Sequence, residues 1–335
     1  MLNEELKLNP KLFDKEVELD ATRSGYGKGL LELGDSDPNV VALSADLTES
    51  TKADGFAKKY PERFFEMGVA EQNMAAVAAG LGISGKTAFI SSYATFSPGK
   101  NWETIRTTIV YNDSNVKIAA HHAGIMTGPD GATHQATEDI ASVRAWPNIQ
   151  IFVPCDAIEA KKATIAAGKI KGPVYLRFSR DKTPIMTTEA TPFEPGKVQV
   201  FWNPPAGGEK PQAVIFGMGW LLYQALLAAK ELGTEGIEVL VANVATIKPA
   251  DESSIVKLAK QTGAVVTIED HQVAGGLGGL VAEVLAKSNP TPMEFVGLQN
   301  VFGESGNPAE LIKKYKMDKD AVIAAVKKVI SRKAV

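Results

Sequence analysis

Short apolar runs alternate with longer amphipathic stretches along the first half of the chain. Four short, mostly apolar runs predict buried strands, at residues 40–43, 116–120, 149–153 and 174–178. Apolar positions that recur every three or four residues predict helices at 29–33, 72–81, 102–111, 137–144 and 157–167. Because strands that alternate with helices form parallel sheets, the pattern predicts an α/β fold with helices on both faces of the sheet.

A proline-rich stretch interrupts this alternation. The segment from Pro184 to Pro211 holds six of the chain's 18 prolines, which is typical of a linker, and it leaves room for one strand. Beyond it, strands are predicted at 213–216, 237–241 and 264–268, and helices at 221–232, 253–261 and 279–287. We therefore expect an N-terminal arm (1–20), a first α/β domain (21–186), a linker (187–210) and a second α/β domain (211–335).

Composition excludes several classes of protein. Hydrophobic residues make up 44% and charged residues 22% of the chain, which argues against intrinsic disorder. The net charge of −3 gives no reason to expect nucleic acid or an anionic membrane as a partner. Cys155 is the only cysteine, and the polar N-terminus has no signal-peptide pattern, so we expect a cytoplasmic protein. The uncharged stretch 211–229 contains glycines and divides into a strand and a helix, so it is not expected to span a membrane.

Glu71 is the first candidate for chemistry. It opens the predicted helix at 72–81, where a carboxylate is stabilised by the helix dipole, so a purely structural role is one interpretation. Its neighbours are small or apolar, however, and a carboxylate shielded in this way needs a partner. Both interpretations remain open at this point.

Three of the four histidines lie in one glycine-rich segment. His121, His122 and His134, together with Asp130, follow the predicted strand 116–120, and ligands of parallel sheets collect at the carboxyl ends of strands. The spacing matches no common metal motif, so a metal site is disfavoured, whereas histidines that only satisfy loop hydrogen bonds remain an alternative.

Two further glycine-rich segments and two isolated arginines carry weaker signals. Residues 24–29 and 274–279 complete neither a phosphate-binding nor a dinucleotide-binding motif, and we interpret both as tight turns between a strand and a helix. Arg23 and Arg180 are surface residues by default, unless the fold brings them together on an anionic substrate.

In combination, these segments resemble the C-terminal part of transketolase, a thiamine-diphosphate enzyme. Seven motifs follow the family's order in the first domain: residues 21–23, 44–50, 68–74, 93–96, 130–135, 144–148 and 178–180. Residues 246–249 and 269–276 are similar to the family's C-terminal domain. The resemblance implies a pyrimidine-binding domain followed by a transketolase C-terminal domain, each built on a mostly parallel sheet.

The resemblance also implies a partner. The family binds the cofactor diphosphate and Mg²⁺ (or Ca²⁺) through an N-terminal domain with a Gly-Asp-Gly motif, which this sequence lacks. The chain would then be the C-terminal subunit of a split transketolase, with no metal ligands of its own, that needs an N-terminal subunit. Two copies of each would form an α2β2 assembly that transfers a two-carbon ketol unit from a ketose phosphate to an aldose phosphate in the pentose phosphate pathway.

Cofactor-binding residues follow from the motif positions. Glu71 would hydrogen-bond N1′ of the aminopyrimidine and so activate the cofactor. Tyr93 and Phe96 would form an aromatic wall against the pyrimidine, and which of them stacks on it is left open. Asp46 and Leu47 would line the cofactor pocket.

Substrate-binding residues follow in the same way. His134 would hydrogen-bond the two-carbon unit and help to move protons, which makes it the second catalytic residue beside Glu71. His122 and Asp130 would line the substrate channel. The sugar-phosphate group would be held by the three remaining matches, which are Arg23, Ser50 and Arg180.

Four alternatives stay open. Deoxyxylulose-phosphate synthase shares the glutamate and the Asp-Gly-x-Thr-His-Gln motif, but it has arginine where His122 stands. A transketolase for a sulfo-sugar would use the same residues. The β subunit of a 2-oxo-acid dehydrogenase has this domain plan but lacks the Thr-His-Gln run. A non-catalytic scaffold would have no need of Glu71, Asp130 and His134.

Overall fold

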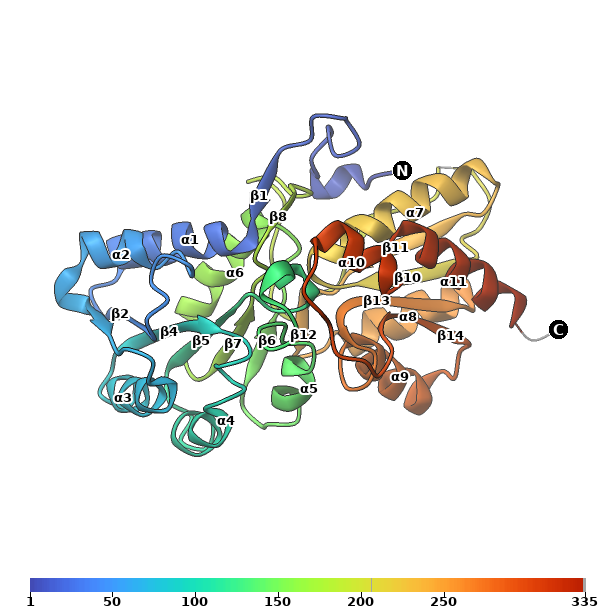
Figure 1. Ribbon diagram of the computed structural model, residues 1–335. Helices are drawn as coiled ribbons and strands as arrows, with labels where there is room; N and C mark the ends of the chain where they lie inside the picture. The colour runs from blue at the N-terminus through green and yellow to red at the C-terminus, as the bar shows by residue number, and fades with distance from the viewer. Residues whose placement is uncertain (206, 334–335) are drawn as a thin grey trace.

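The computed structural model describes residues 1–205 and 207–333 as two α/β units side by side (Figure 1). Residue 206, in the predicted linker, and residues 334–335, at the end of the predicted second domain, lie outside the described residues. Each unit contains one twisted sheet with helices packed on it, which confirms the predicted α/β class.

The first sheet has seven strands in the order β12-β6-β7-β5-β4-β2-β3. Neighbouring strands are parallel except for β12, which is antiparallel to β6. The strands are β2 (Val40–Ser44), β3 (Phe64–Glu66), β4 (Thr87–Tyr93), β5 (Val116–His121), β6 (Gln150–Phe152), β7 (Val174–Arg177) and β12 (Thr246–Lys248). Its helices are α1 (Thr22–Ser36), α2 (Asp54–Lys59), α3 (Glu71–Ile83), α4 (Trp102–Thr104), α5 (Asp139–Arg144) and α6 (Ala157–Lys169).

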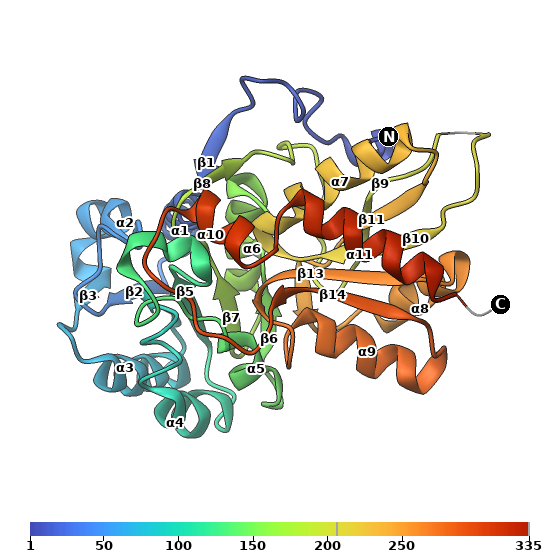
Figure 2. The same ribbon diagram turned by 45° about the vertical axis from the view of Figure 1, so that its right-hand side comes forward.

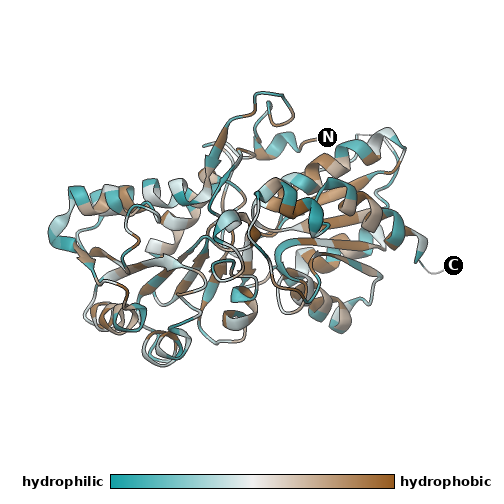
Figure 3. Ribbon diagram, in the orientation of Figure 1, coloured by the Kyte–Doolittle hydropathy of each residue, from teal (hydrophilic) through white to brown (hydrophobic). Residues whose placement is uncertain are grey.

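The second sheet has five strands in the order β14-β13-β10-β11-β9. They are β9 (Gln199–Trp202), β10 (Ala213–Gly217), β11 (Val239–Asn243), β13 (Val265–Gln272) and β14 (Met293–Leu298). The helices are α7 (Leu222–Thr234), α8 (Glu252–Thr262), α9 (Leu277–Ser288), α10 (Pro308–Lys314) and α11 (Lys319–Ser331). Strands β10 and β11 are buried along their whole length because helices cover both faces, and hydrophobic residues are frequent in this unit (Figure 3), whereas β13 also carries buried polar residues.

Several elements differ from the sequence-based expectation: helix α1 begins earlier than predicted, and the pattern did not predict β1 (Leu19–Ala21), β3, β4, β8 (Lys182–Pro184), β12, β14, α2, α10 and α11. The hydrophobic pattern does not mark β4, since this buried central strand contains Ser91 and Ser92. Helix α1 begins at Thr22, seven residues before the predicted start, so the interpretation of residues 24–29 as a turn is wrong. These glycines are helical because α6 packs closely there: a Cβ on Gly25 would lie 1.9 Å from the Ala157 carbonyl oxygen. Gly275, with φ of +80°, does lie in the turn before α9.

Segments far apart in the sequence join the two units. Strand β12 follows β11 in the chain but adds to the first sheet, and one apolar cluster extends from α3 to α9. The N-terminal arm lies along the second unit, where the Asn3 amide donates to the Phe201 carbonyl oxygen over 2.9 Å and Leu12 is buried (Figure 2). A two-stranded sheet of β1 (Leu19–Ala21) and β8 (Lys182–Pro184) closes the first unit. Among the described helices, none is both long and apolar enough to cross a membrane.

Candidate active site

Glu71 is the first residue of α3 and its carboxyl group is buried, with 3% of the side chain exposed. Lys100 Nζ lies 2.7 Å from Glu71 Oε2, and this ion pair is the partner that the sequence analysis did not find. The buried amide of Asn101 donates to the Glu71 backbone carbonyl over 3.0 Å. The segment after β4 therefore fixes both the charge and the backbone of Glu71.

The ion pair with Lys100 predicts an effect on stability. Lys100→Met leaves a buried carboxylate without its cation, and because the lysine side chain is 49% exposed, we expect a loss of only about 1–2 kcal/mol in the unassembled subunit. Chemical denaturation measures this loss. Lys86→Met is the matched control, since the Lys86 side chain is partly exposed and its ammonium group bonds the side-chain amide of Asn39 and not a carboxylate. Equal stability of the two variants would show that the ion pair contributes nothing.

Aromatic rings form a row from the end of β4 to the loop after β5. Tyr93 stacks on His122 with ring centroids 3.9 Å apart, and its ring is also nearly parallel to that of Phe96, 5.9 Å away. His134 meets Phe96 edge-on at 5.4 Å, and its Nδ1 lies 2.9 Å from the Thr133 hydroxyl. The structure thus brings together four of the sequence-predicted residues: Tyr93, Phe96, His122 and His134.

A cationic pocket of about 540 Å³ lies next to Arg23, whose guanidinium group contacts His122. Arg23 Nη1 donates to the Ser50 carbonyl oxygen (2.8 Å) and to His122 Nε2 (3.2 Å). Arg180 Nη1 donates to the Thr127 carbonyl oxygen over 3.0 Å, and Arg180 Nη2 is 4.0 Å from Asp130 Oδ1. The pocket is lined by Ala21, Arg23, Ser24, Lys52, Arg180, Asp181 and Lys182. Lys52 and Lys182 were not predicted, because isolated lysines carry no motif.

His122 is neutral in this setting. Its burial, and then the positive charges of Arg23 and Arg180, lower the pKa of His122 to about 3. Arg23 can only donate, so Nε2 of the imidazole accepts and Nδ1 carries the proton. Within residues 1–205 and 207–333, neither this Nδ1 nor Arg23 Nε, both buried, has a hydrogen-bond partner. Both N–H groups remain available to an oxygen-rich ligand.

His121, the adjacent residue, belongs to the core instead. Its ring packs against Tyr26 (4.8 Å between centroids) and Phe178 (5.1 Å), and burial holds its pKa well below the usual value. His122 lies just beyond the end of β5, with φ of +53°, and its ring contacts Tyr93 and Arg23 instead.

Asp46 and Leu47 line a separate pocket of about 310 Å³ at the end of β2. Glu66, at the end of β3, shapes it: the Asp46 amide and the Thr48 hydroxyl each donate to the Glu66 carboxylate over 2.7 Å. This contact holds Asp46 in a left-handed conformation, with φ of +60°. Glu66, like Lys100, Lys52 and Lys182, was not identified by the sequence analysis.

These groups fit one end of a thiamine cofactor. A buried carboxylate and two neighbouring aromatic rings suit an aminopyrimidine, which needs a hydrogen-bonding acid and flat apolar walls. In the part of the chain that the structure describes, no three His, Cys, Asp or Glu side chains are grouped closely enough to hold a metal ion.

Comparison with known proteins agrees with this geometry. The transketolase pyrimidine-binding domain family matches residues 20–186, and the transketolase C-terminal domain family matches residues 207–322. A putative transketolase C-terminal section of Methanocaldococcus jannaschii is 44% identical over 90% of this chain and 93% of its own length. A 6-deoxy-6-sulfo-D-fructose transketolase subunit of a Clostridium species is 34% identical over 96% of this chain and 98% of its own length.

A solved structure gives the same result. The split-gene transketolase described as an inactive β4 tetramer superposes with a TM-score of 0.86 and 46% identity, over 94% of this chain and 99% of that one. By contrast, the chain spans only about half of a whole transketolase, 49% of the rat enzyme.

The chain therefore belongs to the transketolase family, whose shared activity is thiamine-diphosphate-dependent ketol transfer. Within that family it is the C-terminal subunit of a split transketolase, a transferase that acts together with a partner subunit. This confirms the class of protein inferred from the motifs.

Proposed function

We propose that this chain, joined to an N-terminal subunit that holds the diphosphate of thiamine diphosphate and its Mg²⁺, transfers a two-carbon ketol unit from a ketose phosphate to an aldose phosphate. The observation that carries the proposal is the unbroken row of contacts Phe96, Tyr93, His122 and Arg23. This row connects an aromatic wall for the cofactor to a cationic pocket for the phosphate.

Each end of the row has a chemical task. When bound, thiamine diphosphate supplies the nucleophilic carbon that adds to the ketose carbonyl. Glu71 holds a proton against the pyrimidine nitrogen N1′, in a site where burial excludes water. His134, oriented by Thr133, donates to or accepts from the sugar hydroxyls, and Asp130 accepts from the hydroxyl at C2 of the acceptor.

The cationic pocket would hold the phosphate. Arg23 and Arg180 come from α1 and from the segment after β7, and their guanidinium groups suit a doubly charged oxyanion. Lys52 and Lys182 add positive charge at the pocket wall. A sulfonate would meet the same charges, so the sulfo-sugar remains a second candidate substrate, in line with the Clostridium relative.

Arg180→Ala tests the phosphate pocket. We expect KM for a phosphorylated ketose to rise about 10- to 100-fold, because a charge-assisted hydrogen bond contributes about 1.5–3 kcal/mol, whereas KM for the unphosphorylated ketose changes little. Steady-state kinetics on both substrates measure the difference. Lys28→Met, which removes an exposed lysine paired with Asp20, serves as the control. An equal rise in KM for both ketoses would exclude Arg180 from phosphate binding.

Reconstitution tests the proposed function as a whole. The chain is mixed with an N-terminal transketolase subunit, thiamine diphosphate and Mg²⁺, and ketol transfer is measured from ketose phosphates and from a sulfo-ketose. We expect transfer by the mixture, none by either subunit alone, and an α2β2 mass in solution. A stable complex that transfers from no ketose would support the scaffold alternative instead. We also expect the assembled enzyme in the cytoplasm, within the pentose phosphate pathway.

A further inference from the structure

The loop that carries the substrate groups is held by the second unit. We call residues 122–135 the substrate loop, since it contains His122, Asp130 and His134. Asp270, in β13 of the second sheet, reaches it: the Ile125 amide donates to Asp270 Oδ1 over 3.0 Å. The other oxygen, Oδ2, accepts from Trp220 Nε1 over 2.9 Å. One carboxylate therefore joins a donor from the loop to a donor from its own unit.

The close contact between Asp270 and the substrate loop leaves no space for a side chain at Gly124. Gly124 has φ of +78°, and a Cβ there would lie 2.0 Å from Asp270 Oδ2. Only glycine permits both the backbone conformation and the approach of the carboxylate.

A second contact holds the far end of the substrate loop. Gln135 Nε2 donates to the Gly128 carbonyl oxygen (3.2 Å) within the loop and to the Glu304 carbonyl oxygen (2.9 Å) in the second unit. The segment 303–306 lies against the loop, because a Cβ on Gly131 would meet the Ser305 hydroxyl at 2.5 Å. Both ends of the loop thus rest on the second unit, and helix α10, which follows that segment, packs beside it (Figure 2).

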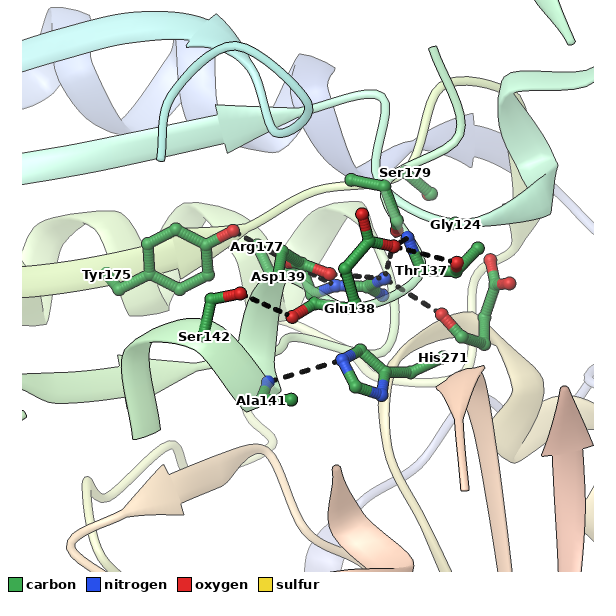
Figure 4. A network of polar contacts seen from close by, with 12 residues as sticks. Gly124, Thr137, Glu138, Asp139, Ala141, Ser142, Tyr175, Arg177, Ser179 and His271 are labelled. Carbon is green, nitrogen blue, oxygen red and sulfur yellow. Dashed lines mark hydrogen bonds and ion pairs between the residues drawn. The ribbon is translucent and has the colours of Figure 1, made fainter. Parts of the chain in front are cut away.

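Burying the Asp270 carboxylate costs free energy, which argues that its position in the fold has a specific role. It is 2% exposed, and burial raises its pKa, while the charge of Arg177 counteracts this rise. Arg177 Nη2 also donates to the backbone oxygens of Asp270 (2.8 Å) and Ala136 (3.2 Å). Figure 4 shows Arg177 beside Asp139, with His271 approaching α5 from the neighbouring unit. These contacts therefore fix the end of β13 that carries Asp270 independently of its hydrogen bond to the substrate loop.

We propose that Asp270 is a positioning residue of the second unit that sets the conformation of the substrate loop and so places His122, Asp130 and His134 for the sugar. This inference rests on the proposed function of those three residues. The second unit then influences substrate binding without contributing a side chain to the site. Glu71 lies on α3, Tyr93 ends β4 and Phe96 follows it, so all three belong to segments outside the loop. Because Tyr93 and Phe96 only contact loop residues through their rings, we expect a change at Asp270 to affect sugar binding much more than cofactor binding.

Asp270→Asn is the decisive variant. An amide keeps the volume but cannot accept from both N–H donors, so one donor loses its partner. In the assembly with the N-terminal subunit, we expect kcat/KM for the sugar phosphates to fall about 10- to 100-fold, which corresponds to about 1.4–2.7 kcal/mol. The dissociation constant for thiamine diphosphate, measured by calorimetry, is expected to stay within about twofold of the wild-type value, as a change under 0.5 kcal/mol.

The matched control is Glu283→Gln. Glu283 also joins the two units, through an ion pair of 2.6 Å with Arg144, but it is exposed and does not contact the substrate loop. We expect it to leave both measurements unchanged. Wild-type kcat/KM in Asp270→Asn, or an equal loss of cofactor affinity and of transfer, would overturn the proposal.

Two further measurements keep the test independent of folding and of the proposed function. If Asp270→Asn does not fold, Trp220→Phe removes one of the two donors and retains the carboxylate, and a smaller fall in kcat/KM is expected in the same direction. Hydrogen exchange at the Ile125 amide, measured in the chain alone, should accelerate at least tenfold in Asp270→Asn, and by a smaller but measurable factor in Trp220→Phe, where the carboxylate keeps this donor but loses the other. Unchanged exchange would overturn the positioning role even if the wild-type pair proved inactive with every sugar.

Discussion

Replacing Glu71 with glutamine is expected to slow ketol transfer by about 10²- to 10⁴-fold, the range typical for the loss of a positioned acid or base. Glutamine has the size of glutamate and can occupy the same buried place, so assembly with the partner subunit should persist. It cannot exchange a proton with the pyrimidine nitrogen, however, and the charge that Lys100 now contacts at 2.7 Å is gone. The measurement is kcat in the reconstituted complex, at saturating thiamine diphosphate.

The control for Glu71→Gln is Glu62→Gln. Glu62 lies on the neighbouring turn before β3, is mostly exposed, and makes only a loose ion pair of 3.6 Å with Arg63. We expect wild-type kcat in this control. An unchanged kcat in Glu71→Gln would refute the catalytic assignment and leave the helix-stabilising role as the explanation for the carboxylate.

The largest effect on stability is expected from Asp139→Ala. Asp139 Oδ2 accepts from Arg177 Nε (2.8 Å) and from the Tyr175 hydroxyl (2.7 Å), and all three side chains are buried (Figure 4). Removing the carboxylate takes away the counter-charge that contacts the buried guanidinium directly, which typically costs about 3–5 kcal/mol. Urea denaturation followed by tryptophan fluorescence measures the loss of free energy of unfolding.

The pH dependence of that loss has a defined sign. Burial alone would raise the pKa of Asp139, but the charge of Arg177, together with the hydrogen bonds from Arg177 and Tyr175 and the nearby His271, outweighs burial and holds the pKa below the usual range. The carboxylate therefore contributes its full stabilisation above the unfolded-state pKa of about 3.9, and the contribution is lost as the pH falls through the lower folded-state value. Wild type and variant should differ by the same amount from pH 5 to 8 and converge only in stronger acid.

Asp54→Ala provides the comparison for Asp139. Asp54 also pairs with a cation, Lys58, over 2.8 Å, but this pair lies at the surface of α2, where ion pairs contribute about 0–1 kcal/mol. A loss in Asp139→Ala no larger than that in Asp54→Ala would mean that the buried pair does not stabilise the fold.

Local patterns were sufficient to predict most of the elements. Strands such as β10, and β11 up to Ala242, are apolar because helices cover both faces, and this is visible as uninterrupted hydrophobic runs. The central strand β4 escaped prediction because two buried serines interrupt its apolar pattern. One of them, Ser91, has a partner from a distant segment, since its hydroxyl lies 2.6 Å from the Tyr26 hydroxyl on α1. A contact of this kind depends on packing between distant segments and leaves no periodic signal.

The residues of the candidate site also form two groups: those that a local motif marks and those that only the folded chain brings together. Glu71, Tyr93, His122 and Arg180 belong to short motifs, so their residue types and spacing were sufficient to single them out. Lys100 and Glu66 lie in no such motif, and they reach the site only because the turns after β4 and β3 bring them there. Asp270 is more remote still, since a strand of the other sheet carries it. Such residues become visible only once the chain is folded.

Strand β12 has a consequence for how this architecture can change over generations. It leaves the second unit to complete the edge of the first sheet, while Asp270 extends from the second unit to the substrate loop. Recombination that exchanged only residues beyond 186 between two relatives would import a foreign edge strand and a foreign support for the loop. The two units must therefore be exchanged together if the edge strand and the support of the loop are to stay matched, even though each unit resembles an independent domain.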